Sequence, residues 1–185
     1  KENCMSDAGP EFDLTCICDV SRETIQSLRV YANLLEKWNK TINLVSKSTI
    51  NHMWERHFLD SAQLWPHIPE NAKTLVDIGS GAGFAGLVLA IIGKEKNPNL
   101  RVVLIESDTR KCAFMRNVSR ETNINVEIIT KRIEEAIASD RQLENLIIND
   151  NAAYKCISGD FNRLRCQSIR GICLEKLPRA EEAPS

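Results

Sequence analysis

A stretch of ten residues, 75–84 (LVDIGSGAGF), constrains the fold of this chain more than any other. Residues 74–78 form a short run with several β-branched side chains, which predicts a buried strand. Three glycines on alternate positions follow it, namely Gly79, Gly81 and Gly83. Apolar residues then recur at helical spacing until Gly93. This order of strand, glycine turn and helix is typical of the first unit of a nucleotide-binding α/β fold.

The glycine turn predicts a small-molecule site. Glycine lacks a Cβ, so a ligand can lie directly against the backbone. The first N–H groups of the following helix have no partner within the helix and carry a partial positive charge, which attracts an anionic group. We therefore expect a ligand at the carboxyl end of the first strand.

The glycine spacing and two carboxylates indicate which ligand. The dinucleotide fingerprint G-x-G-x-x-G places its third glycine where Phe84 stands, whereas this chain has G-x-G-x-G. Asp77, expected at the mouth of the strand, would disfavour a pyrophosphate and favour a cationic ligand. Glu106 ends the second predicted strand, residues 100–105, where a carboxylate can bind both hydroxyls of a ribose. S-adenosylmethionine carries an ammonium, a sulfonium and no phosphate, and it is favoured over a dinucleotide; an ordinary solvated carboxylate is the alternative for Glu106.

Composition excludes several other classes. With 185 residues, 43% of them hydrophobic and 26% charged, the chain is typical of one soluble globular domain. Its apolar run at residues 84–92 is far shorter than the roughly 20 residues that span a bilayer, and no stretch resembles a secretory signal. Seven cysteines without paired C-x-x-C spacing indicate reduced thiols and no metal site. We expect a cytoplasmic monomer without membrane association.

The order of predicted elements indicates an α/β fold with a doubly wound, mostly parallel sheet. A weakly patterned segment, 1–20, precedes the domain that is expected to bind the methyl donor, 21–150. This domain divides into cap helices at 21–66 and a cofactor-binding half at 73–150. Strands at 74–78, 100–105, 126–130 and 146–148 alternate there with helices at 84–92, 109–122 and 132–139. Right-handed crossovers place Gly79, Glu106 and the loop after Thr130 along one edge, which is the expected site.

Charge is unevenly distributed along the chain. The net charge is −1, so nothing global requires nucleic acid. Residues 110–132, however, hold six Lys and Arg against two Glu. Such a basic segment can dock a phosphate backbone, although a solvated helix face is an equal alternative.

Five motifs in order resemble one family. Residues 35–46, LEKWNKTINLVS, are similar to the "KWNK…NLTS" signature of ribosomal small-subunit methyltransferase G, also called glucose-inhibited division protein B. Residues 56–61, RHFLDS, resemble its "RHxLDS" segment. Residues 77–84 match its cofactor loop, usually written with proline where Ala82 and Ala85 stand. Residues 106–107 and 131–135 resemble its ribose and adenine segments, so the likeness runs from about 21 to 148.

The resemblance implies a Rossmann-like enzyme that transfers a methyl group from S-adenosylmethionine to N7 of a guanine in small-subunit (16S) ribosomal RNA. It places Gly79 and Phe84 at the methionine and ribose end of the cofactor, Glu106 at the ribose, and Ile133 and Glu134 beside the adenine. The full set of expected cofactor-binding residues is Asp77, Gly79, Gly81, Gly83, Phe84, Glu106, Ile133 and Glu134. The candidates for RNA phosphates are Arg56, Arg110, Lys111 and Arg132.

No catalytic side chain is expected. Guanine N7 is a lone-pair acceptor with no proton to lose, so the rate should depend on alignment and on exclusion of water. His57 is therefore interpreted as structural rather than as a base. Because N7 lies in the deep groove of A-form RNA, the target should be an unpaired or exposed guanine.

The resemblance stops after the fourth predicted strand. Where the family continues into a serine-arginine-alanine segment, this chain has Asn149-Asp150-Asn151 and no arginine. The tail at 151–185 shows neither the expected helix nor further strands, and its end looks disordered. Frameshift, truncation and genuine divergence all fit this pattern. Three hypotheses stay open: an rRNA methyltransferase, a methyltransferase of another substrate, and an inactive remnant that binds cofactor or RNA.

Overall fold

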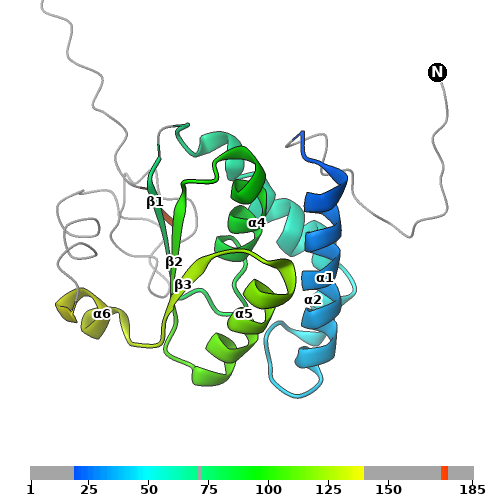
Figure 1. The fold of residues 1–185 in the computed structure, drawn as a ribbon. Helices are drawn as coiled ribbons and strands as arrows, with labels where there is room; N and C mark the ends of the chain where they lie inside the picture. Colours follow the sequence, from blue (N-terminus) through cyan, green and yellow to red (C-terminus); the bar gives the residue numbers. More distant parts are fainter. Residues whose placement is uncertain (1–18, 71, 140–171, 175–185) are drawn as a thin grey trace, which may run out of the picture.

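The computed structural model describes residues 19–70, 72–139 and 172–174. A helical cap comes first, followed by alternating strands and helices (Figure 1). The cap consists of α1 (Arg22–Asn39), α2 (Lys47–Ile50), the π-helix η2 (Trp54–Leu59), α3 (Asp60–Ala62) and the 3-10 helix η3 (Trp65–His67). The remainder consists of β1 (Thr74–Ile78), α4 (Gly86–Lys96), β2 (Arg101–Ile105), α5 (Thr109–Thr122), β3 (Val126–Ile129), α6 (Ile133–Ser139) and β4 (Ile172–Leu174).

The sheet has the strand order β3-β2-β1-β4, and β1, β2 and β3 are parallel, which confirms the predicted α/β class. Val76 lies opposite Val103, and Val103 lies opposite Glu127. The strand predicted at 146–148 lies outside the described residues. The tail contributes a strand that its sequence did not predict, because β4 pairs antiparallel with the free edge of β1.

Helices cover both faces of the sheet, in two layers on one face and by α6 on the other. On one face α4 and α5 pack against the strands, and α1 packs on both of them as an outer layer (Figure 1). Every residue of α4 from Gly86 to Gly93 is buried, as expected of a helix enclosed between a sheet and a further helix layer. On the other face, Val76, Val103 and Ile105 form a smaller apolar cluster with Ala136 of α6.

The cap differs in part from its prediction. Ser21 is the N-cap of α1, since its Oγ accepts a hydrogen bond from Thr24 N at 3.2 Å. The part of the predicted cap that follows α1 is divided into the short helices α2, η2, α3 and η3. A π-helical turn changes which side chains face the core, and here it is followed by the buried Ser61 and Ala62. Sequence periodicity could not predict this change of register.

Among the described residues, no helix combines the length and the apolar character needed to cross a bilayer.

Candidate functional site

The carboxyl ends of β1, β2 and β3 meet at one edge of the sheet, which we call the carboxyl edge. The loops there line a cavity of about 180 Å³. Its lining residues are Ile78, Gly79, Ile105, Glu106, Ser107, Lys131, Arg132, Ile133 and Glu134. The structure therefore brings together four of the predicted cofactor-binding residues, Gly79, Glu106, Ile133 and Glu134, although they come from three separate loops.

The turn after β1 requires its glycines. Gly79, Gly81 and Gly83 have φ angles of 71°, 59° and 84°, a region that other residues rarely adopt. A Cβ on Gly83 would collide with the side chain of Leu87, whereas a Cβ on Gly79 would meet nothing within 4 Å. The backbone at Gly79 therefore borders open space in which a ligand can approach it closely.

Glu106 is held in place from two sides. Its Oε2 accepts a hydrogen bond from Gly81 N at 2.9 Å, and its Oε1 accepts one from Asp108 N at 2.8 Å. These bonds join the glycine turn to the start of α5. Oε1 also accepts a longer hydrogen bond from Ser107 Oγ, at 3.5 Å. Since a carboxylate oxygen can accept two hydrogen bonds, Oε2 keeps a further lone pair. Glu106 is thus preoriented in the cavity lining, as a ribose-binding group must be.

Asp77 does not lie at the mouth of the strand as predicted. Its side chain is 3% exposed, and its Oδ2 accepts a hydrogen bond from Gly86 N, at the start of α4, at 3.1 Å. Burial raises the pKa of Asp77 to about 7, against the lowering effect of the Gly86 bond. The carboxyl group contacts α4 behind the glycine turn and is absent from the residues that line the cavity.

Phe84 also lies apart from the cavity. Its ring stacks on His57 at 4.4 Å and on Tyr31 at 5.5 Å, and it meets Phe58 edge-on at 5.4 Å between ring centroids. The helical cap therefore encloses Phe84. His57 packs in this aromatic cluster, as the sequence interpretation expected. Its burial and, to a smaller extent, the positive charge of Arg56 lower its pKa.

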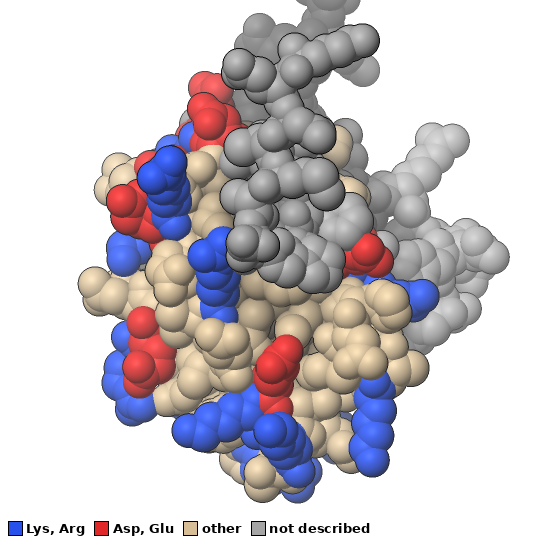
Figure 2. All heavy atoms as spheres, turned by 90° about the vertical axis from the view of Figure 1, so that its right-hand side faces the viewer, with Lys and Arg blue, Asp and Glu red and all other residues tan. Residues whose placement is uncertain are grey.

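The predicted RNA-binding residues are distributed over three elements. Arg132 lines the cavity, and Arg110 and Lys111 lie in the first turn of α5 beside it. Arg110 forms an ion pair with Asp108, 3.1 Å between Nη2 and Oδ2, and its hydrogen bonds hold the pKa of Asp108 at about 2. Arg56 is exposed on η2. On the side where α1 lies, Figure 2 shows several Lys and Arg side chains at the lower end of the molecule, with fewer acidic ones among them.

Two residues that sequence reasoning did not single out bind the glycine turn. Tyr31 Oη donates to Ala82 O at 2.6 Å, and Ser61 Oγ accepts from Ala85 N at 3.0 Å. Nothing in the local sequence around Tyr31 connects it to residue 82. The signal available for Ser61 was its place in the RHFLDS segment, which nothing local connects to residue 85.

Comparison with known proteins identifies a family. Residues 24–150 match the family model described as rRNA small subunit methyltransferase G (GidB). Proteins named ribosomal RNA small subunit methyltransferase G are 48% identical in Ruegeria sp. over 71% of this chain and 54% identical in Paramagnetospirillum magneticum over 69%. The Rickettsia akari protein of the same name is 51% identical over 75% of this chain.

The match covers only part of each relative. It covers 62% of the Ruegeria protein, 59% of the Paramagnetospirillum protein and 71% of the Rickettsia protein. The matched part contains α1 and everything from there to α6, and thus the glycine turn, Glu106 and the cavity. The chain belongs to the rRNA small subunit methyltransferase G family.

Proposed function

We propose that the carboxyl edge binds S-adenosylmethionine and that the chain transfers its methyl group to N7 of a guanine in 16S ribosomal RNA. The observation that carries this proposal is the fixed carboxylate of Glu106, held by Gly81 N and Asp108 N in the lining of the cavity. A ribose with two free hydroxyls fits such a carboxylate, whereas a phosphorylated ribose would be repelled by it.

The dimensions of the cavity limit what it encloses. At about 180 Å³ it is smaller than the roughly 300–1,000 Å³ of pockets that enclose a whole drug-sized ligand. We therefore assign only the nucleoside end to it, with the ribose at Glu106 and the base between Ile78 and Ile133. The methionine end would lie over the open backbone of Gly79, where no Cβ obstructs it.

The chemistry proposed for the site requires positioning rather than proton transfer. When bound, the cofactor supplies a methyl group on a sulfonium. Guanine N7 would bond to this methyl group through its own lone pair as the methyl–sulfur bond breaks, the neutral thioether leaves and the positive charge passes to the guanine. N7 loses no proton, so no residue of this chain has to act as a base. The residues at the carboxyl edge bind, orient and desolvate the reactants, which supplies most of the rate advantage in a reaction of this kind.

Titration of the full chain tests the cofactor assignment. Calorimetry is expected to show binding of S-adenosylmethionine and of S-adenosylhomocysteine, and none of NAD. Binding of NAD with no binding of the methyl donor would overturn the proposal. Methyl transfer should then be measured on 30S subunits and on naked 16S RNA. Cofactor binding without transfer to either would favour the hypothesis of an inactive binding remnant.

A basic triple variant tests the RNA assignment. Replacing Arg110, Lys111 and Arg132 together by Gln should weaken RNA binding and reduce the slope of log affinity against log salt by about 2, at about 0.7 per phosphate contact on single strands. Because Arg132 also lines the cavity, cofactor affinity is measured alongside RNA affinity, and the salt slope carries the test. The matched control replaces Lys94, Lys96 and Arg101, which lie at the opposite edge of the sheet. An unchanged slope in the first triple variant, or an equal loss in the second, would contradict the assignment.

A further inference from the structure

The cap contacts the glycine turn through a short series of buried polar bonds. Ser61 is 6% exposed, and its Oγ donates to His57 O at 2.6 Å while accepting from Ala85 N at 3.0 Å. The bond to His57 O uses the single proton of the hydroxyl, so a lone pair must face Ala85. Three residues earlier in the turn, Tyr31 Oη donates to Ala82 O at 2.6 Å.

The backbone of Ala85 explains why such a bond is needed. Its φ of 72° and ψ of −68° lie in a region that residues with a Cβ rarely adopt. Proline cannot adopt this φ at all, since its ring holds φ near −65°. Strained backbone of this kind persists only where surrounding contacts determine it. The contact that fixes the direction of the Ala85 N–H is Ser61 Oγ.

The turn is also held from its opposite side. Glu106 binds Gly81 N and Asp77 binds Gly86 N, both from the sheet. The cap holds Ala82 and Ala85 between these points, and the stack of Phe84 on His57 lies in the same interval. Loss of a cap contact would therefore alter the shape of a turn whose two ends stay attached.

We propose that Ser61 is a positioning residue for the cofactor: its hydroxyl holds Ala85 in its positive-φ conformation and thereby keeps residues 79–86 in the shape that binds the methyl donor. The inference rests on the proposed function for its ligand. Ser61 acts through Ala85 and is not among the residues that line the cavity. The cap is accordingly a part of the cofactor site and more than a cover for the core.

The first test compares two serine variants of the full chain. Ser61→Ala should weaken S-adenosylmethionine binding about tenfold in calorimetry. The matched control is Ser119→Ala, near the carboxyl end of α5 and away from the glycine turn. It removes a hydrogen bond of similar length, from Ser119 Oγ to Ile124 O at 2.7 Å. It should lower the melting temperature comparably and leave cofactor affinity within twofold of the parent. Equal affinities for Ser61→Ala and the parent would overturn the inference.

A rescue experiment tests the route through Ala85. Glycine adopts positive φ without strain, so Ala85→Gly should make the hydroxyl largely dispensable. Ser61→Ala in the Ala85→Gly background should cost less than about threefold in affinity, against tenfold alone. A tenfold loss in both backgrounds would show that Ser61 does not act through the backbone of Ala85, and the inference would be abandoned.

A measurement without ligand separates this inference from the proposed function. Amide hydrogen exchange of Ala85 should be at least tenfold faster in Ser61→Ala than in the parent. In Ser119→Ala, exchange of the same Ala85 amide should match that of the parent. If the parent chain bound no S-adenosylmethionine, the proposed function would fail, but exchange would still decide whether Ser61 holds the turn. Unchanged exchange at Ala85 would refute that role.

Discussion

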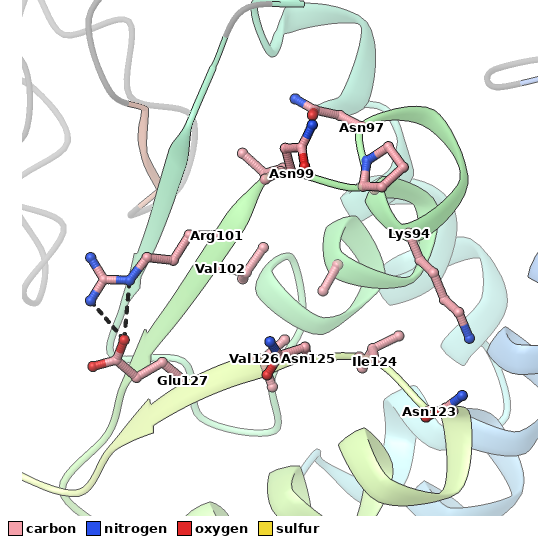
Figure 3. A pocket seen from close by; sticks show the side chains of 14 residues that line it. Lys94, Asn97, Asn99, Arg101, Val102, Asn123, Ile124, Asn125, Val126 and Glu127 are labelled. Atoms are coloured by element: carbon pink, nitrogen blue, oxygen red, sulfur yellow. Dashed lines mark hydrogen bonds and ion pairs between the residues drawn. The ribbon is translucent and has the colours of Figure 1, made fainter.

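The two edges of the sheet differ in the size of their cavities and in what their polar side chains bind, and the edge with the smaller cavity is the candidate site. The edge where the strands begin has the larger hollow, about 690 Å³, bordered by the end of α4 and by the loops before β2 and β3 (Figure 3). Two of its charged side chains, Arg101 and Glu127, form an ion pair at 2.7 Å, and Asn97 binds Ala72 O. The carboxyl edge encloses about 180 Å³. There, the carboxylate of Glu106 binds the backbone of two loops, at Gly81 N and Asp108 N, in addition to the exposed ion pair of Arg110 with Asp108.

The contacts made by polar side chains at each edge indicate which edge is a binding site. Side chains that pair with each other on a surface satisfy themselves and contribute little free energy. Side chains that hold backbone in uncommon conformations do so at a structural cost, which is typical of binding sites. Convergence of such contacts therefore locates the candidate site better than volume does. Four experiments test this comparison. Three of them compare a variant at the carboxyl edge with a variant at the other edge, and one concerns Asp77 alone.

The largest expected effect of a substitution on stability at constant pH concerns the two ends of α4. A Cβ on Gly86 would collide with Leu104 and lie 2.6 Å from Asp77 Oδ2, so Gly86→Ala should lower the free energy of unfolding by about 2–3 kcal/mol. A Cβ on Gly93 would meet Trp65 at 3.5 Å, an ordinary contact, and Gly93→Ala should raise it by about 0.5–1 kcal/mol. Urea unfolding measures both values. A comparable loss for the two variants would remove the contrast between the edges.

Asp77 should make stability depend on pH. Burial raises its pKa to about 7 from an ordinary value of 3.8, so between these values the folded chain keeps a proton that the unfolded chain has lost. The free energy of unfolding therefore falls as pH rises through this window, by up to about 1.4 kcal/mol per pH unit from this group. Tyr31 and Glu106 are the charged or titratable neighbours that act on it.

The measurement is the stability of the parent minus that of Asp77→Asn from pH 4.5 to 8. Asparagine keeps an oxygen for Gly86 N and does not titrate. Contributions from other groups, such as His57, cancel in this difference. The difference should decrease steadily with pH and level off above about 7. A flat difference would show that the carboxyl group is not buried in the way the structure describes.

Two glutamates compare the edges in cofactor binding. Glu106→Gln replaces one acceptor oxygen by an amide that cannot accept from Gly81 or Asp108, and we expect S-adenosylmethionine affinity to fall about tenfold, about 1.4 kcal/mol. Glu127→Gln removes the exposed partner of Arg101 at the other edge and should leave the affinity unchanged. Isothermal titration provides both constants. If Glu127→Gln weakened binding as much, the cofactor assignment to the carboxyl edge would be wrong.

The smallest effect concerns the two described residues other than glycine that have positive φ, one at each edge. Ala85 lies at 72° and Asn123, the C-cap of α5, at 52°. Ala85→Gly should raise the free energy of unfolding by about 0.5–1 kcal/mol, because strain is relieved. Asn123→Gly should change it by only a few tenths of a kcal/mol, because asparagine tolerates the left-handed region. Thermal unfolding that ranked the two in the reverse order would contradict the conformation of Ala85.

Local patterns were sufficient for much of the fold. The strand, glycine turn and helix at β1 and α4 follow from residue periodicity and from the positive φ that Gly79, Gly81 and Gly83 adopt. The order of elements and the handedness of crossovers then predicted which edge would hold Glu106, Ile133 and Glu134. These features depend on interactions between near neighbours in the chain, so the sequence by itself determined them.

Only the tertiary structure decided how the site is held. Asp77 was expected at the mouth of the strand, because the sequence of β1 could not show that its side chain is buried against α4 rather than directed at a ligand. The direction of Phe84 depends on the backbone of the whole turn. The bonds from Tyr31 to Ala82 and from Ala85 to Ser61 join residues 51 and 24 positions apart. Such bonds exist only once the cap has packed on the sheet, because no local pattern specifies which distant donor an acceptor will meet.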